Sequence, residues 1–207
     1  MNGTVELLAP AKDLLCAIEA VNHGADAVYM GAARFGARSA AGNTTRDVEK
    51  AASYAHRYGA SVYVTLNTLL YDQELADAVK LTRELYRAGV DALIIQDIRL
   101  LYLRQQRVLP PIPIHASTQM DNATLEKILF LEKEGFDRIV LARELGLDEM
   151  RKIREKTSVP LECFIHGALC VSYSGKCYIS QADCGRSANR GRSEERRVGK
   201  ECRSRWS

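Results

Sequence analysis

The chain has 207 residues, 46% of them hydrophobic and 27% charged, which is enough for one large globular domain with a substantial core. Apolar runs stay well short of the roughly 18 residues of a membrane span, and the N-terminus lacks the pattern of a signal peptide, so we expect a cytoplasmic protein. The net charge of +3 gives no argument for nucleic-acid binding, because residues 192–207 supply all of it.

Seven strand-like apolar runs follow one another along the chain, with helical stretches between them. The predicted strands are 5–8, 27–31, 61–67, 92–96, 112–116, 138–142 and 161–166. The predicted helices are 14–21, 48–56, 72–88, 122–132 and 147–156. Strict alternation of this kind predicts a parallel sheet covered by helices.

Four of these units share one pattern, in which a glycine is followed after one residue by Asp or Ser and then by an apolar run. They occupy residues 23–31, 58–67, 88–97 and 134–143. A glycine after a helix is the usual left-handed helix stop, and continuous apolar runs suit strands buried on both faces. The even spacing and short loops favour a (β/α)8 TIM-barrel-like fold over an open doubly wound sheet.

Such a barrel typically needs about 250 residues, so seven strands predict an incomplete α/β barrel whose eighth strand is missing. We assign residues 1–191 to this truncated domain. Residues 192–207 are charged, have no apolar periodicity, and resemble the translation of a sequencing adapter. We therefore expect a non-native disordered tail there, and a natural protein that continues beyond Gly191.

Polar side chains follow nearly every apolar run, at the strand ends where barrel enzymes carry their active sites. The candidate catalytic residues from this pattern are Asn67, His115, Gln119, Glu144 and His166. The two histidines are candidates for acid–base chemistry. The alternative is structural: strand ends become polar because they meet solvent, and Arg143–Glu144 forms a helix-start ion pair.

Two cysteines, Cys170 and Cys177, follow His166 and are separated by a polar loop that contains Gly175. In a cytosolic protein cysteines are more often ligands or packed thiols than disulfides. Zinc sites usually have two to four residues between ligands, and iron–sulfur sites need four ligands. The spacing alone leaves iron–sulfur, zinc and unligated thiols open.

The region around these cysteines resembles the signature of the peptidase U32 family, the so-called collagenase-like proteases. The pattern Glu-x-Phe-x-x-Gly-[Ser/Ala]-aliphatic-Cys-x4-Gly-x-Cys-x-aliphatic-Ser is matched by Glu162, Phe164, Gly167, Ala168, Leu169, Cys170, Gly175, Cys177, Ile179 and Ser180. Residues 6–11, 24–29, 115–119 and 185–191 are also similar to the family, so the resemblance covers essentially residues 4–191.

The resemblance implies a barrel-like domain and, as in several members, a [4Fe–4S] cluster held by four cysteines. Cys170 and Cys177 match two of these ligands, whereas Ser193 stands where the third would fall. We therefore expect the full-length protein to hold the cluster and the chain as written to be inactive.

Members similar to this chain hydroxylate RNA bases, giving 5-hydroxycytidine in 23S rRNA or 5-hydroxyuridine in tRNA, with prephenate linked to the oxygen source. The resemblance thus implies an iron–sulfur enzyme that acts on RNA. One alternative is a collagenase-like peptidase acting on peptides, with Cys170 as a nucleophile near His166; the chain has no His-Glu-x-x-His motif. Another is oxygen-independent ubiquinone hydroxylation or an accessory role.

Overall fold

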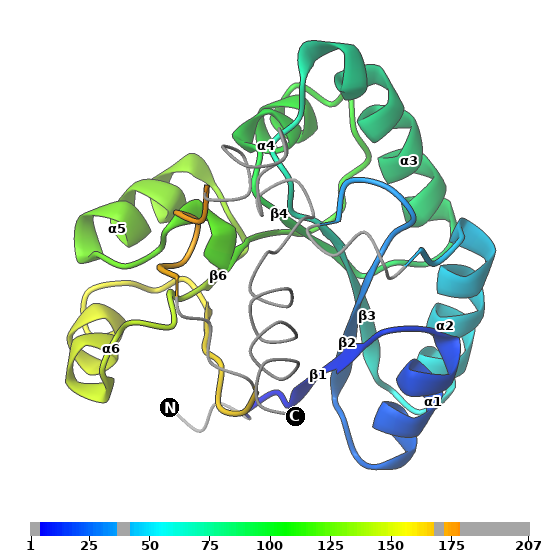
Figure 1. Cartoon of the computed structure of the whole chain (residues 1–207), viewed down its shortest axis with the longest axis horizontal. Helices are drawn as coiled ribbons and strands as arrows, with labels where there is room; N and C mark the ends of the chain where they lie inside the picture. Colours follow the sequence, from blue (N-terminus) through cyan, green and yellow to red (C-terminus); the bar gives the residue numbers. More distant parts are fainter. Residues whose placement is uncertain (1–4, 37–41, 168–171, 179–207) are drawn as a thin grey trace, which may run out of the picture.

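The computed structural model describes residues 5–36, 42–167 and 172–178 of the chain. Seven strands form a single curled sheet, and the helices lie around its outside (Figure 1). The strands are β1 (Leu8–Ala11), β2 (Ala27–Gly31), β3 (Ser61–Leu66), β4 (Ala92–Ile95), β5 (Ile114–Ala116), β6 (Arg138–Val140) and β7 (Leu161–Glu162).

Every strand pairs in parallel with the next one along the chain, from Leu8 opposite Ala27 to Val140 opposite Glu162. Within the described residues β1 and β7 are the two edges of the sheet. The predicted fold class is confirmed: the described residues form a parallel (β/α) barrel with seven of its eight strands. Residues 192–207 lie outside the described part of the chain, so the proposed division at residue 191 stays a prediction.

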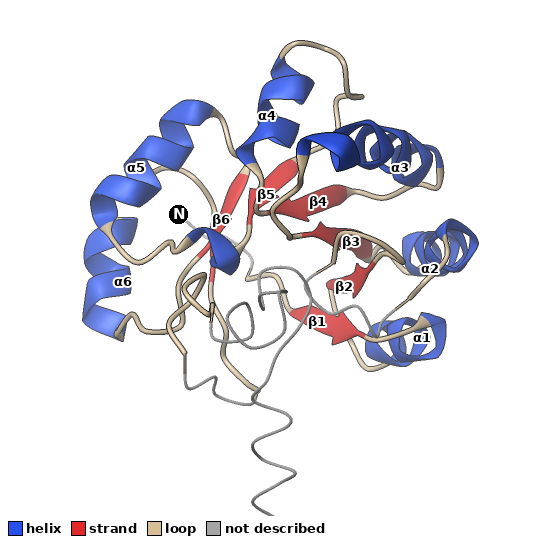
Figure 2. Cartoon of the chain, turned by 45° about the horizontal axis from the view of Figure 1, so that its top comes forward, coloured by secondary structure: helices blue, strands red, loops and turns tan. Residues whose placement is uncertain are grey.

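The helices follow the strands and surround the sheet as an outer layer (Figure 2). They are α1 (Leu14–Asn22), α2 (Thr45–Arg57), α3 (Leu75–Arg87), α4 (Ile98–Gln105), α5 (Leu125–Glu134) and α6 (Leu147–Arg154), with short 3-10 helices η1 (Asp72–Glu74) and η2 (Thr118–Met120). In the part of the chain that the structure describes, no helix has the length and apolar character of a membrane span.

The strands bury side chains on both faces, as their continuous apolar runs predict. One core lies between the sheet and the helices and includes Val62, Leu93 and Ile139. A smaller cluster fills the inside of the barrel, where Tyr63 and Val140 pack with small residues such as Ala27. All four residues of β4 are buried, because this strand lies in the middle of the sheet.

The repeated glycine and aspartate have separate structural roles. Gly24, Gly59, Gly89 and Gly135 follow α1, α2, α3 and α5 and have φ between +74° and +92°, as expected for helix stops. The aspartate that follows each of three of these glycines accepts a hydrogen bond from a backbone amide. That amide lies just before or near the start of the strand that precedes the aspartate in the sequence. The bonds run from the amides of Leu7, Val62 and Ile114 to Asp26, Asp91 and Asp137 at 2.8, 2.7 and 2.8 Å.

The bond at Asp91 should be worth a measurable part of the folding free energy. The amide that it accepts from belongs to Val62, which is fully buried. Asp91→Ala leaves this N–H without an acceptor, and we expect a loss of about 1–3 kcal/mol of unfolding free energy in urea titrations. The control is Asp148→Ala, which removes an exposed ion pair with Arg151 and should cost at most about 0.5 kcal/mol. Equal effects of the two substitutions would contradict the assignment.

Element bounds were wrong at several places, for example in α5, which spans Leu125–Glu134 instead of 122–132, and three of the differences have a clear cause. The first strand is 8–11 instead of 5–8; Pro10 is tolerated there because β1 is an edge strand, where a missing N–H does no harm. The last strand ends at Glu162, four residues earlier than predicted. Helix α4 was not assigned a range, because its apolar residues do not form one stripe and only Leu100 and Leu101 are buried.

Candidate functional site

In a parallel sheet the carboxyl ends of all strands lie at one rim, which we call the barrel mouth. Four predicted residues lie just after strand ends there: Asn67 after β3 and Gln119 after β5 are half-buried, while Glu144 and His166 are exposed. Gln96, after β4, donates from Nε2 to the carbonyl of Gln119 at 3.1 Å and so ties two neighbouring strand ends together. The predicted roles of these residues remain predictions.

His115 lies elsewhere than the strand-end pattern suggested. It is the central residue of β5, is 4% exposed and packs edge-to-face with Tyr63, with the ring centroids 4.9 Å apart. Its side chain therefore points into the barrel instead of standing at the mouth. Burial lowers the pKa of His115 to about 4, so the imidazole is neutral at pH 7.

A buried asparagine organises the mouth and was missed by the sequence reasoning, which placed it inside a helix. Asn122 is fully buried, and its Nδ2 donates to the carbonyls of Ser117 and Val140 at 2.9 and 2.8 Å. These carbonyls belong to the ends of β5 and β6. One side-chain amide thus fixes the spacing of two adjacent loops at the mouth.

Residues 172–178, which we call the cysteine loop, dock onto these same two strand ends. Ser174 is almost fully buried and its Oγ lies 3.3 Å from Thr118 Oγ1, just after β5. Its backbone N–H donates to Glu144 Oε1, after β6, at 2.6 Å. Cys177 is half-buried on this loop and carries a free thiol. Cys170 lies outside the described residues.

The inside of the barrel holds a connected group of polar side chains, which we call the interior cluster. Its members are Glu6, Tyr63, His115, Arg138 and Glu162. Arg138 forms an ion pair with Glu6, whose Oε2 lies 3.2 Å from Nη2, and approaches Glu162 Oε2 at 3.8 Å. The hydroxyl of Tyr63 donates to Glu6 at 2.9 Å. Glu6 precedes β1, so the Arg138–Glu6 pair connects the two sides of the open barrel.

The two carboxylates of this cluster titrate differently because only one is fully paired. Burial pushes the pKa of Glu6 upward, but hydrogen bonds from Arg138 and Tyr63 outweigh it and hold the pKa below its usual value. Burial raises the pKa of Glu162 to about 7, against the weaker attraction of Arg138. Within the described residues, Glu162 Oε2 has no hydrogen-bond partner, and neither has His115 Nδ1.

Sequence reasoning missed Arg138, although the repeat contains a signal for it. In two other repeat units the residue after the aspartate is alanine, Ala27 or Ala92, and both are buried inside the barrel. Arg138 takes the same place in the fourth unit. A charged residue at a position that is otherwise small and buried predicts a buried ionic partner.

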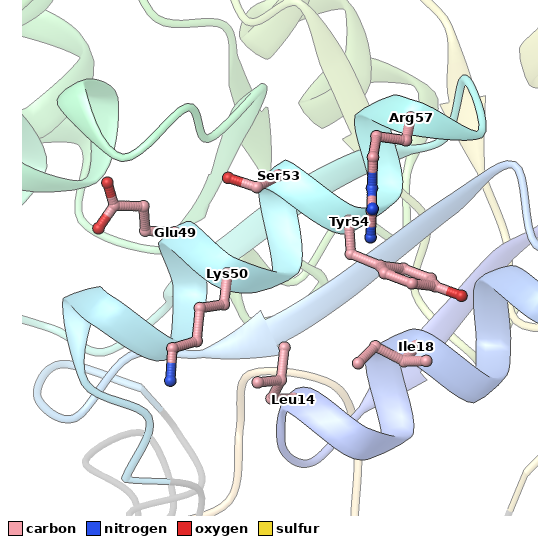
Figure 3. Close-up of a pocket in the computed structure, with 7 residues that line it drawn as sticks. All are labelled: Leu14, Ile18, Glu49, Lys50, Ser53, Tyr54 and Arg57. Carbon is pink, nitrogen blue, oxygen red and sulfur yellow. The ribbon is translucent and has the colours of Figure 1, made fainter.

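A groove of about 460 Å³ lies on the outside of the molecule between α1 and α2 (Figure 3). Leu14, Ile18, Lys50, Tyr54 and Arg57 are among its lining residues. The guanidinium of Arg57 lies 5.0 Å from the centre of the Tyr54 ring. None of the predicted site residues that the structure describes lines this groove, so it is separate from the barrel mouth.

These features define a parallel α/β-barrel protein with a cysteine-bearing loop docked at the barrel mouth. The family profile of Peptidase family U32 matches residues 12–207. The chain therefore belongs to peptidase family U32, as its signature predicted. A solved structure described as the U32 peptidase Mk0906 has the same fold, with a TM-score of 0.65 and 19% identity over 79% of this chain and 70% of that one.

Curated relatives match most of this chain. It is 56% identical over 187 residues to the Escherichia coli 23S rRNA 5-hydroxycytidine C2501 synthase, and 38% identical over 187 residues to the Bacillus subtilis tRNA hydroxylation protein P1. It is 34% identical over 200 residues to a Porphyromonas gingivalis collagenase. Each match covers 90% of this chain but only 28%, 44% and 47% of the relative. The chain thus spans less than half the length of these relatives.

Proposed function

We propose that the full-length protein hydroxylates a base in RNA, with a cytidine of 23S rRNA as the substrate and the cytoplasm as its location. The main support is the 56% identity to the Escherichia coli rRNA synthase over 90% of this chain. This identity is well above the 34–38% found for the tRNA hydroxylation proteins and the collagenase. Hydroxylation replaces the C5–H bond by C5–OH, a two-electron oxidation of the base, so the oxygen donor must itself be reduced by two electrons or a separate acceptor must take them up. Prephenate, linked to the oxygen source by the family resemblance, is the proposed co-substrate.

A [4Fe–4S] cluster is the proposed cofactor. In the described part of the chain, no three side chains of His, Cys, Asp or Glu gather into a metal site, so the test of fit rests on Cys177. Its thiol is free, half-buried and held at the barrel mouth, and thiolates are the ligands that iron–sulfur clusters require. Cys170 and Cys177 would hold two irons, and the cluster would supply one-electron redox chemistry.

The side chains around the mouth have separate proposed roles. His166 is exposed four residues beyond β7 and is the candidate to hold or move a proton near the substrate. Asn67 and Gln119 are candidates for hydrogen bonding to the base or the co-substrate. His115 lies inside the barrel and stays neutral at pH 7, so its proposed contribution is to shape the mouth from below.

Deletion of the gene tests the substrate. We expect 5-hydroxycytidine to disappear from digests of 23S rRNA measured by mass spectrometry, and to return when the full-length gene is supplied. Loss of 5-hydroxyuridine from tRNA instead would move the assignment to the tRNA group. Unchanged nucleosides in both RNAs would contradict the proposal.

Proteolysis is the second candidate function, because a collagenase is among the relatives. A cysteine mechanism would use Cys170 as the nucleophile, with His166 as the base. Peptide cleavage by the purified full-length protein that is lost in Cys170→Ala but kept after removal of iron would favour this function. Cleavage that survives Cys170→Ala would exclude this mechanism.

A further inference from the structure

We propose that Glu144 is a positioning residue: it holds the cysteine loop against the ends of β5 and β6 and thereby sets where the Cys177 thiol stands. The inference rests on the proposed function, because it concerns the loop that carries one of the two cluster cysteines. It assigns Glu144 a task different from the catalytic role that the strand-end pattern suggested. Three sets of contacts support it.

The first is a tight turn at the centre of the loop. The backbone N–H of Lys176 donates to the carbonyl of Tyr173 at 3.1 Å, which closes the turn. Within it Tyr173 and Lys176 are exposed, whereas Ser174 between them is only 1% exposed. A buried polar residue in an otherwise exposed turn shows that the turn is seated on the body of the protein.

The second is the set of hydrogen bonds that satisfies the buried Ser174. Its N–H donates to Glu144 Oε1 at 2.6 Å, and its Oγ accepts from the backbone N–H of Arg143 at 3.4 Å. The same Oγ lies 3.3 Å from Thr118 Oγ1, and Thr118 itself donates to the carbonyl of Leu141 at 3.2 Å. The shortest of these bonds is the charge-assisted one to Glu144, which is the strongest type in such a set.

The third is the close approach of Gly175 to the chain after β5. Gly175 has φ +74°, and a Cβ on it would stand 3.1 Å from the carbonyl carbon of Gln119, closer still to its oxygen, and 3.2 Å from the amide of Asp121. All of these are backbone atoms, so no side chain can move aside. Lys176 adds an exposed ion pair with Asp121 at 2.8 Å, which contributes little by itself.

These contacts explain why the glycine between the two signature cysteines must be a glycine. They also fix Cys177, two residues further on, with respect to the mouth. A cluster needs its thiolates to converge, and a loop that is already ordered loses less conformational entropy when it binds. Because Glu144 acts by accepting a hydrogen bond, a neutral amide oxygen at the same place can do the same.

The test measures the reactivity of the Cys177 thiol in the iron-free full-length protein, with alkylation by iodoacetamide followed site by site by mass spectrometry. We expect Glu144→Ala to speed alkylation of Cys177 about tenfold, because the loop opens when a charge-assisted bond is lost. Glu144→Gln should give a rate between those of wild type and Glu144→Ala, because its amide oxygen still accepts the bond but without the charge. Gly175→Ala should speed alkylation at least as much as Glu144→Ala.

Cys163 is the internal control, because it is exposed and lies outside the loop. Its alkylation rate should be the same in every variant. After reconstitution with iron and sulfide, Glu144→Ala should hold less iron and show weaker visible absorbance, and Glu144→Gln should restore both. An unchanged Cys177 rate in Glu144→Ala, or equal rates in Glu144→Ala and Glu144→Gln, would overturn the proposal.

The alkylation result does not depend on the cofactor. If the wild-type protein takes up no cluster, the proposed function loses its cofactor, while the Cys177 rates still decide the role of Glu144. If the cluster forms equally well in wild type and Glu144→Ala, the proposed function stands and the positioning role is refuted.

Discussion

Arg138→Met is expected to lower the unfolding free energy of the full-length protein by about 1–3 kcal/mol, because it leaves the carboxylates of Glu6 and Glu162, whose side chains are 30% and 18% exposed, without their cation. Arg138 is the partner of Glu6 and lies 3.8 Å from Glu162 Oε2, and its side chain is only 21% exposed. The measurement is a urea titration at pH 8. Methionine keeps most of the apolar volume of the arginine stem. The lost stability is therefore due to the missing charge and not to a cavity.

The matched control and a rescue make this result specific. Arg151→Met removes an exposed pair with Asp148 and should cost at most about 0.5 kcal/mol. Adding Glu6→Gln and Glu162→Gln to Arg138→Met should restore much of the loss, since no carboxylate of the cluster is then left without its cation. A cost below about 1 kcal/mol for Arg138→Met, or a triple variant no more stable than the single one, would contradict the interior cluster.

The second large effect is on the pH dependence of stability, where Glu162 and His115 act in opposite directions. The folded state raises the pKa of Glu162 from 4.5 to about 7, so its contribution to stability is full below pH 4.5 and is lost as the pH rises through 7. The folded state lowers the pKa of His115 from 6.5 to about 4, so its contribution is full above pH 6.5 and is lost as the pH falls through 4.

Single variants should separate the two slopes. Relative to wild type, Glu162→Gln should gain stability steadily between pH 4.5 and 7, and His115→Gln should gain stability as the pH falls from 6.5 to 4. Each change amounts to about 3 kcal/mol, at about 1.4 kcal/mol per pKa unit. Urea titrations at several pH values measure both. Parallel pH profiles for wild type and both variants would mean that neither group is perturbed by the barrel interior.

The fold was predictable because its information is local and repeated. Each unit has a glycine that stops a helix, an aspartate and a buried strand, and the alternation of helices and strands requires a parallel sheet. Helix α4 was not predicted because its sequence has no apolar stripe. Only Leu100 and Leu101 are buried, and they mark the side of the helix that faces the core. The first strand was misplaced because its bounds depend on pairing with β2, which begins 19 residues after Leu8.

The candidate site was predictable only in part. Polar residues after strands do gather at the mouth, as Gln96 and Gln119 show. The alternation of side chains along β5 could not be fixed from sequence, so the inward position of His115 was missed. The interior cluster depends on a contact between Glu6 and Arg138, which lie 132 residues apart; the repeat marks Arg138 as unusual, but no local pattern identifies Glu6 as its partner.

The most direct test of the central claim, RNA hydroxylation through the cysteine loop, is complementation of the gene deletion with single cysteine variants of the full-length protein. The measured quantity is the fraction of 5-hydroxycytidine in 23S rRNA. Cys163 and Cys177 are both free thiols, but only Cys177 lies on the docked loop. The account predicts that Cys163→Ser restores the modified base and Cys177→Ser does not. Full restoration by Cys177→Ser would contradict it.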